Sequence, residues 1–169
     1  MADKTHHYEV SLEWIGDRGS GTRGYAGYER AHVLSAPGRP DIPGSSDPHF
    51  RGDSARWNPE QLLLASLSAC HQLWYLHLCS VNQVTVVGYR DVAAGEMSEH
   101  ADGSGQFVRV VLRPEVVIAA GSDAEQALQL HHQASSLCFI ARSMNFPVEH
   151  APSVRTADQL RRPGMQPEV

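Results

Sequence analysis

Basic residues are in the minority among the charged residues of this sequence. Lysine and arginine together number 14, against 19 aspartate and glutamate residues, which gives a formal net charge of −5. A chain with this balance has no basic surface to neutralise phosphate groups. Nucleic acids and anionic membranes are therefore not expected partners.

The sequence also lacks a long uninterrupted apolar run. Its most apolar segment, residues 62–81, is broken by the polar residues Ser66, Ser68, His71, Gln72 and His77. These interruptions favour a core helix over a membrane span. The N-terminal residues contain a polar run and no apolar stretch of the kind found in a signal peptide. We therefore expect a cytoplasmic protein that is neither exported nor inserted in a membrane.

Cysteine is scarce: the chain has three, at positions 70, 79 and 138. Three cysteines cannot all pair with one another, and a cytosolic protein normally keeps its thiols reduced. Structural disulfides are therefore not expected, which leaves packing, metal binding or catalysis as roles for the thiols.

The length and the apolar patterning predict one α+β domain over residues 1–169, with residues 1–6 and 157–169 poorly ordered. A hydrophobic content of 41% in 169 residues is enough for one core. The alternation of apolar residues and the turn signals predict the order β-β-α-β-β-α-β. The expected strands are residues 7–14, 25–34, 83–94, 106–119 and 147–154, and the expected helices are residues 58–80 and 122–144.

Each expected helix begins with a recognisable capping signal and carries one of the cysteines. Asn58-Pro59-Glu60 places a capping side chain, a proline in the first turn and an early acidic residue in succession. This first helix has no clean polar face, so we expect it to be buried nearly all round. Ser122 and Glu125 have the spacing of a capping box for the second helix.

The residues alone leave the roles of Cys70 and Cys138 open. If the two helices pack together, as a single core requires, the two thiols could lie at disulfide distance. Two small buried side chains would equally satisfy the packing of such a core. Cys79, nine residues after Cys70 and on the opposite side of the helix, is expected to serve packing only.

A longer sequence motif favours a reactive role for the two cysteines over a packing role. The run Asn58-Pro59-Glu60-Gln61-Leu62-Leu63, followed by Ser68-Ala69-Cys70, resembles the helix that carries the peroxidatic cysteine in the OsmC/Ohr family of organic hydroperoxide reductases. Cys138, 68 residues further on, matches the position of the family's resolving cysteine. The resemblance implies an OsmC/Ohr-like fold in which two central helices pack on antiparallel sheets in an intertwined homodimer.

The resemblance also implies a reaction and a set of site residues. Cys70 would attack a peroxide oxygen, become a sulfenic acid and condense with Cys138 to form a disulfide. A buried thiol needs a nearby cation to react as a thiolate, and in the family an arginine held by the glutamate of the Asn-Pro-Glu motif supplies it. That glutamate would be Glu60. Arg51 is our first choice for the cation, and Arg56, Arg30 and Arg23 stay open as alternatives.

The positions of Glu60 and Cys70 on one predicted helix limit how the two side chains could meet. Ten residues of continuous helix would separate it from Cys70 by about 15 Å. Either the helix breaks between them or the carboxylate comes from a second chain, and the resemblance favours a homodimer with active sites at its interface.

The same resemblance predicts the other partners. It implies an organic hydroperoxide substrate, with hydrogen peroxide as an alternative, a dithiol or lipoyl-bearing protein as reductant, and no cofactor or metal. The residues near the cysteines that would suit an alkyl chain are Leu73, Trp74, Phe139 and Ile140. The chain departs from the family pattern at His71, directly after Cys70, and at Phe139, where many relatives have proline. His71, together with His77, His131 and His132, makes a zinc site conceivable, but no short Cys/His cluster has metal-ligand spacing.

Two further functional hypotheses remain. A cysteine nucleophile acting on acyl or other electrophilic substrates would have no need of Cys138. A redox-sensing or ligand-binding module would keep the fold and its reactive thiol without turnover.

Overall fold

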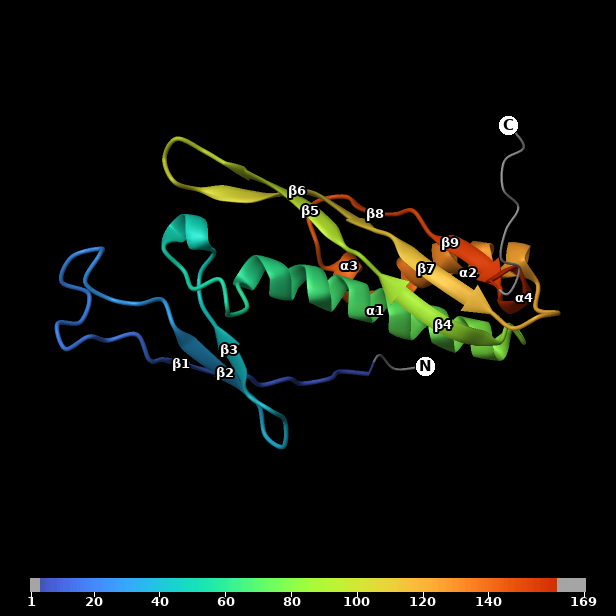
Figure 1. Cartoon of the computed structure of the whole chain (residues 1–169), viewed down its shortest axis with the longest axis horizontal. Coiled ribbons are helices and arrows are strands. Elements are labelled where there is room, and N and C mark those ends of the chain that lie inside the picture. Colours follow the sequence, from blue (N-terminus) through green and yellow to red (C-terminus); the bar gives the residue numbers. More distant parts are fainter. Residues whose placement is uncertain (1–3, 161–169) are drawn as a thin grey trace. The chain divides into compact units, whose positions relative to one another are not determined.

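The computed structural model of the chain describes residues 4–160, which form two compact units, residues 4–63 and 64–160 (Figure 1). The first unit contains an antiparallel sheet of three strands in the order β1-β2-β3. These strands are β1 (Ser11–Trp14), β2 (His32–Ser35) and β3 (Ile42–Gly44), and a 3-10 helix, η1 (Pro48–Phe50), follows them.

The first two strands are shorter than the alternation of apolar residues predicted. Residues 7–10 and 25–31 lie outside the regular ladder, which begins at Ser11 and at His32. The intervening connection contains Gly19, Gly21 and Gly24, all with positive φ, so it forms turns that cannot continue a strand. Residues 35–57, which contain no predicted helix or strand, include β3 and η1.

Helix α1 (Pro59–Val81) begins and ends within one residue of the prediction. Its first turn is closed by two reciprocal hydrogen bonds: Asn58 Oδ1 accepts from the Gln61 backbone N–H at 2.7 Å, and Gln61 Oε1 accepts from the Asn58 N–H at 3.3 Å. Gln83, with φ of 62°, turns the chain away after the helix. The expectation of burial nearly all round is wrong for the single chain, because Leu73 is 67% exposed.

The second unit contains two mixed sheets where two long strands were expected. One has the order β4-β7-β9, from β4 (Val86–Asp91), β7 (Pro114–Ile118) and β9 (Ser153–Thr156). The other has the order β5-β6-β8, from β5 (Ala94–Glu99), β6 (Gly105–Leu112) and β8 (Val148–His150). The C-terminal strands β8 and β9 add in parallel, and the remaining pairs are antiparallel.

The predicted strand 106–119 is divided at Arg113, because β6 and β7 pair in different sheets. The predicted strand 83–94 contains β4 alone, and β5 lies almost entirely outside the predicted strands. At the end of β4, Asp91 Oδ1 accepts a hydrogen bond from the Arg113 backbone N–H at 2.7 Å. A side chain thus satisfies the donor that leaves the ladder. The predicted last strand, residues 147–154, is divided between β8 and β9 in the same way.

The second predicted helix is also interrupted, at Cys138. It consists of α2 (Ala124–Leu137) and the single turn α3 (Phe139–Arg142). Asp123, and not Ser122, is the N-cap of α2 and accepts from the Gln126 N–H at 3.0 Å. The Ser122 hydroxyl accepts instead from the Thr85 N–H at 3.2 Å. The predicted capping box is therefore wrong.

The main hydrophobic core of the second unit lies between the β4-β7-β9 sheet and helices α1 and α2 (Figure 1). Its buried residues are Tyr75, Leu78, Cys79, Val84, Val116, Ile118, Ala127, Leu130 and Ala134. The thiol of Cys79 is thus a core group, as its position on the helix predicted. Within residues 4–160, no helix is long and apolar enough to cross a membrane.

The two termini expected to be poorly ordered are described only in part. Residues 157–160 form a short helix, α4 (Ala157–Leu160). Residues 1–3 and 161–169 lie outside the described part of the chain.

Candidate functional site

The structure brings Cys70 and Cys138 together although they lie on different elements. Cys70 is on α1, and Cys138 is at once the last cap of α2 and the first cap of α3. Their thiols are within hydrogen-bonding reach of each other, and both are free. Cys138 is 1% exposed, whereas Cys70 is only partly buried. The pair therefore has one thiol open to a small molecule and one held behind it.

The surroundings of Cys138 favour its protonated form. Burial, followed by the hydrogen bond with the Cys70 thiol, raises the pKa of Cys138 to about 11. A weak opposing effect comes from the backbone of α3, because the Ala141 N–H donates to Cys138 Sγ at 3.5 Å. Cys138 is thus a neutral thiol near pH 7, which suits a second, resolving thiol better than an attacking thiolate.

An apolar pocket of about 670 Å³ opens onto Cys70. Trp74 and Phe139 form one wall, with ring centroids 5.6 Å apart in an edge-to-face contact. Phe139 is 65% exposed, so this wall faces outward in the single chain. Besides Cys70, the sequence had assigned four of the lining residues to this surface, and the structure adds three more. The lining is Ser66, Ala69, Cys70, Leu73, Trp74, His77, Phe139 and Ile140.

A group of four imidazoles lies on the other side of α1, next to the cysteine. His71 is 1% exposed and His131 is 0% exposed, and His71 Nε2 is 3.0 Å from His131 Nδ1. His132 Nδ1 and His150 Nε2 are 3.4 Å apart, and the rings of His71 and His150 have centroids 5.7 Å apart. The sequence could not show this arrangement, because the hydrogen-bonded rings are 60 and 18 residues apart in the chain.

The histidine group does not form a metal centre in this geometry. Among the side chains that the structure describes, no group of three or more His, Cys, Asp or Glu residues is arranged to hold a metal ion. His77, which the sequence grouped with the other histidines, lines the Cys70 pocket instead and packs edge-on against Trp74.

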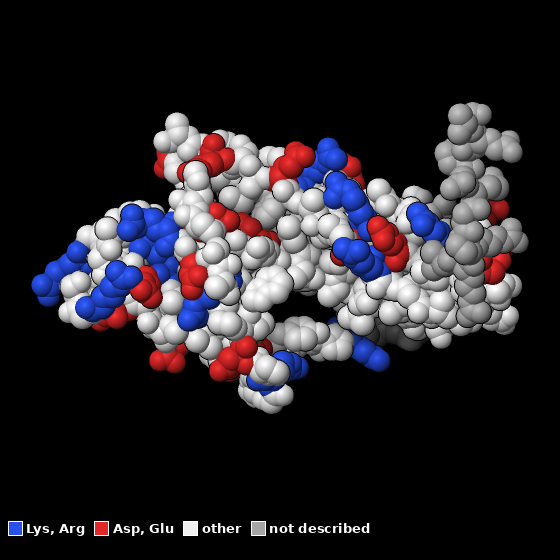
Figure 2. Space-filling view, viewed as in Figure 1, with Lys and Arg blue, Asp and Glu red and all other residues white. Residues whose placement is uncertain are grey.

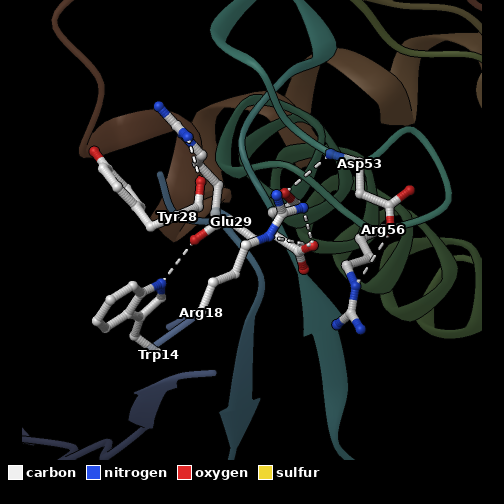
Figure 3. A network of polar contacts seen from close by, with 8 residues as sticks. Trp14, Arg18, Tyr28, Glu29, Asp53 and Arg56 are labelled. Carbon is white, nitrogen blue, oxygen red and sulfur yellow. Dashed lines mark hydrogen bonds and ion pairs between the residues drawn. The ribbon is translucent and has the colours of Figure 1, made fainter. Parts of the chain in front are cut away.

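The four candidate arginines belong to the first unit, where polar contacts hold two of them. Arg56 Nε is 3.5 Å from Asp53 Oδ2, and a neighbouring pair joins Arg18 to Glu29 (Figure 3). The Arg30 guanidinium lies 4.4 Å and 4.2 Å from the ring centroids of two tyrosines and donates to two backbone carbonyls. These contacts fix Arg30 and reduce the freedom of Arg56.

Arg51 is held more loosely than Arg30 or Arg56. It ends η1 in the left-handed conformation, with φ of 64°. Its guanidinium carbon is 5.9 Å from the centroid of the Tyr25 ring. Arg51 also lines a polar pocket of about 260 Å³ with Arg18 and Arg30. Arg23 is exposed in the turns after β1. The pairing of any of these arginines with Cys70 stays a prediction.

Basic side chains gather at one end of the first unit, with acidic side chains beside them (Figure 2). The charged residues of the polar pocket are of both signs: Arg18, Arg30 and Arg51 with Glu29 and Asp53. A cation here can therefore be held by neighbouring carboxylates.

Glu60 stands in the first turn of α1, ten residues before Cys70, which lies near the middle of the same unbroken helix. The continuity of α1 from Pro59 to Val81 rules out the helix break that would bring Glu60 to the Cys70 of its own chain. Within the described residues, Glu60 Oε2 is buried and has no hydrogen-bond partner. A buried carboxylate oxygen in this condition is suited to receive a cation.

A family model for OsmC-like proteins matches residues 52–152. Solved structures share the fold. An OsmC-like protein of unknown function from Vibrio cholerae is 28% identical, over 88% of this chain and 100% of that chain, with a TM-score of 0.80. An OsmC-like protein from Mycoplasma pneumoniae is 12% identical, over 89% and 99% of the two chains, with a TM-score of 0.69. An organic hydroperoxide resistance protein from Legionella pneumophila is 16% identical, over 89% and 98%, with a TM-score of 0.63. A search of curated protein sequences found no significant match.

Proposed function

The chain belongs to the OsmC-like protein family, and we propose that it is a cytoplasmic, thiol-dependent peroxidase that reduces organic hydroperoxides through Cys70 and Cys138. The observation that carries this proposal is the contact between a partly exposed thiol in an apolar pocket and a buried thiol behind it. Some structural relatives, including the protein from Legionella pneumophila, are organic hydroperoxide resistance proteins.

In the first step the Cys70 thiolate attacks the terminal oxygen of the hydroperoxide. The sulfur–oxygen bond forms as the oxygen–oxygen bond breaks, and the leaving alkoxide takes up a proton to become an alcohol. Cys70 is oxidised to a sulfenic acid. The apolar pocket would hold the organic part of the substrate while the peroxide group meets the sulfur.

In the second step the Cys138 thiol attacks the sulfenic sulfur of Cys70. A disulfide forms, and the sulfenic hydroxyl leaves as water with the proton of Cys138. An external dithiol or lipoyl-bearing protein then reduces the disulfide to two thiols and is itself oxidised to a disulfide. A cysteine hydrolase or transferase would leave the Cys138 thiol without a role, so the contact between the two thiols favours the peroxidase.

A homodimer would complete the site. Leu73 and Phe139 are 67% and 65% exposed beside Cys70, and a second chain would cover such an apolar surface. A partner chain would also bring a Glu60 and an arginine, with Arg51 as the first choice, toward Cys70. The buried and unpaired Oε2 of Glu60 supports its role in holding that cation.

The decisive experiment is stopped-flow consumption of cumene hydroperoxide and of hydrogen peroxide, with dithiothreitol as the reductant. Wild type and Cys79→Ser should both turn over, because Cys79 lies in the core, whereas Cys70→Ser should not. Phe139→Ala should lower kcat/KM for cumene hydroperoxide about tenfold relative to hydrogen peroxide, since it removes apolar contact with the organic group. Equal peroxide loss with wild type and Cys70→Ser would refute the proposal.

A further inference from the structure

The buried histidine pair joins the two helices that carry the reactive cysteines. His71 directly follows Cys70 on α1, and His131 is on α2, seven residues before Cys138. One hydrogen bond, 3.0 Å long, links the two rings. On its other face His131 stacks on Tyr75, with ring centroids 3.8 Å apart and planes 11° apart. The pair therefore fixes α2 against α1 close to the contact between the cysteines.

The hydrogen bond depends on the protonation state of the rings. In a neutral pair, one nitrogen donates the proton and the facing nitrogen accepts it. A first added proton leaves a donor and an acceptor in place but puts a charge on a ring that is fully buried. A second added proton gives two positively charged donors that face each other, so the bond is lost.

Little around the pair could compensate such a charge. From α2 and β8, His132 and His150 would add like charge. Among residues 4–160, the acidic group that acts on His71 is Asp91 of β4, and its oxygens already accept from the Ser68 hydroxyl and the Arg113 N–H. Tyr75, which stacks on His131, has a phenol and a thiol as its own neighbours, those of Tyr89 and Cys79. His131 Nε2 is itself buried without a partner among the described residues.

We propose that the hydrogen bond between His71 and His131 positions Cys70 against Cys138, and that acid disrupts this positioning by protonating the two rings. His71 and His131 are positioning residues, because within residues 4–160 their rings hydrogen-bond to each other and not to a thiol. The inference rests on the proposed function for its biological meaning, but the positioning itself can be measured without any peroxide.

The pKa values of the pair set the direction of the effect. Burial, the main cause in both cases, lowers the pKa of His71 to about 4 and that of His131 to about 3. Both values lie below the ordinary value of 6.5. A state in which the hydrogen bond is broken and the rings reach water therefore binds protons more readily than the hydrogen-bonded pair does. Formation of the hydrogen-bonded pair is fully favoured above pH 6.5. Below that value, the titration of each ring lowers the equilibrium constant for forming the pair about tenfold per pH unit, until the pH reaches the lowered pKa.

The test is the equilibrium between the Cys70–Cys138 disulfide and glutathione, measured by mass spectrometry at pH 7 and pH 4.5. The informative variant is the double substitution His71→Gln and His131→Asn, because the amide groups replace Nε2 and Nδ1 as hydrogen-bonding groups but cannot titrate. His100→Gln, in an exposed turn, is the matched control. Urea unfolding at pH 7 checks that each variant is folded, and His131→Asn alone serves if the double variant is not.

In wild type and His100→Gln, the equilibrium constant for disulfide formation should fall at least about tenfold between pH 7 and pH 4.5. In the amide variant the fall should be much smaller. The same fall in the amide variant and wild type, or no fall in wild type, would overturn the proposal. A glutathione equilibrium that behaves as expected in a protein that consumes no peroxide would reject the peroxidase and leave the positioning role standing.

Discussion

The thiol of Cys138 lies within hydrogen-bonding reach of the Cys70 thiol although 68 residues separate the two in the chain. Cys138 is the more deeply buried of the two, and Cys70 faces the apolar pocket. In the proposed reaction this arrangement sets the order of the two thiols, because a peroxide would reach Cys70 first.

Treatment with one equivalent of cumene hydroperoxide should therefore give a disulfide between Cys70 and Cys138, detectable by mass spectrometry after digestion. Cys138→Ser should accumulate sulfenic acid at Cys70, which dimedone would trap, because the resolving thiol is gone. Cys79→Ser should behave like wild type. Free thiols at both positions after oxidation would contradict the assignment of Cys70 and Cys138.

The cation that activates Cys70 can be identified by substituting arginines one at a time. Arg51→Ala should slow the reaction with peroxide about 100-fold, the size of effect seen when one group that stabilises charge is removed. Arg51→Lys should recover part of the rate. Arg39→Ala, an exposed arginine of the same unit, is the control. If Arg51→Ala reacts at the wild-type rate and Arg56→Ala, Arg30→Ala or Arg23→Ala does not, the cation is that other arginine.

A homodimer with shared sites predicts complementation between inactive chains. Cys70→Ser lacks the nucleophile, and Glu60→Gln loses the carboxylate that holds the cation. Equal amounts of the two variants, unfolded and refolded together, should regain about a quarter of wild-type activity if Glu60 serves the Cys70 of its partner. No recovery would show that each chain uses its own Glu60. Sedimentation at micromolar concentration should give twice the chain mass of 18.5 kDa, and a monomer would exclude the shared site.

The first helix could be predicted closely because its signals are local. Asn58 and Gln61 cap each other within one turn, and the sequence shows this spacing directly. The start of α2 was mispredicted for the opposite reason. The Ser122 hydroxyl bonds to Thr85, 37 residues away, and Asp123 takes over as the cap. Local patterns cannot reveal a competing hydrogen-bond partner that the fold brings in from a distant part of the chain.

In the candidate site too, features with local sequence signals could be predicted and features that depend on distant partners could not. The family motif placed Cys70 and Cys138 in one site, and the pocket residues near them in sequence, such as Trp74 and Phe139, followed. The hydrogen bond between His71 and His131 could not be predicted, because its partners are 60 residues apart and neither belongs to a motif. Which arginine faces Cys70 in the proposed homodimer would also depend on how the two chains assemble, and no local sequence pattern contains that information.

The backbone at Cys138 is extended, with φ of −65° and ψ of 110°, and it separates α2 from α3. The backbone of a cysteine in the middle of a helix, such as Cys70 in α1, is fixed by the hydrogen bonds of the turns on both sides. At Cys138, a rotation about the torsion angles of this one residue can move the sulfur while α2 and α3 stay intact. In the proposed catalytic cycle, the protein would therefore alternate between dithiol and disulfide with little distortion of either helix, which would favour many turnovers without damage to the fold.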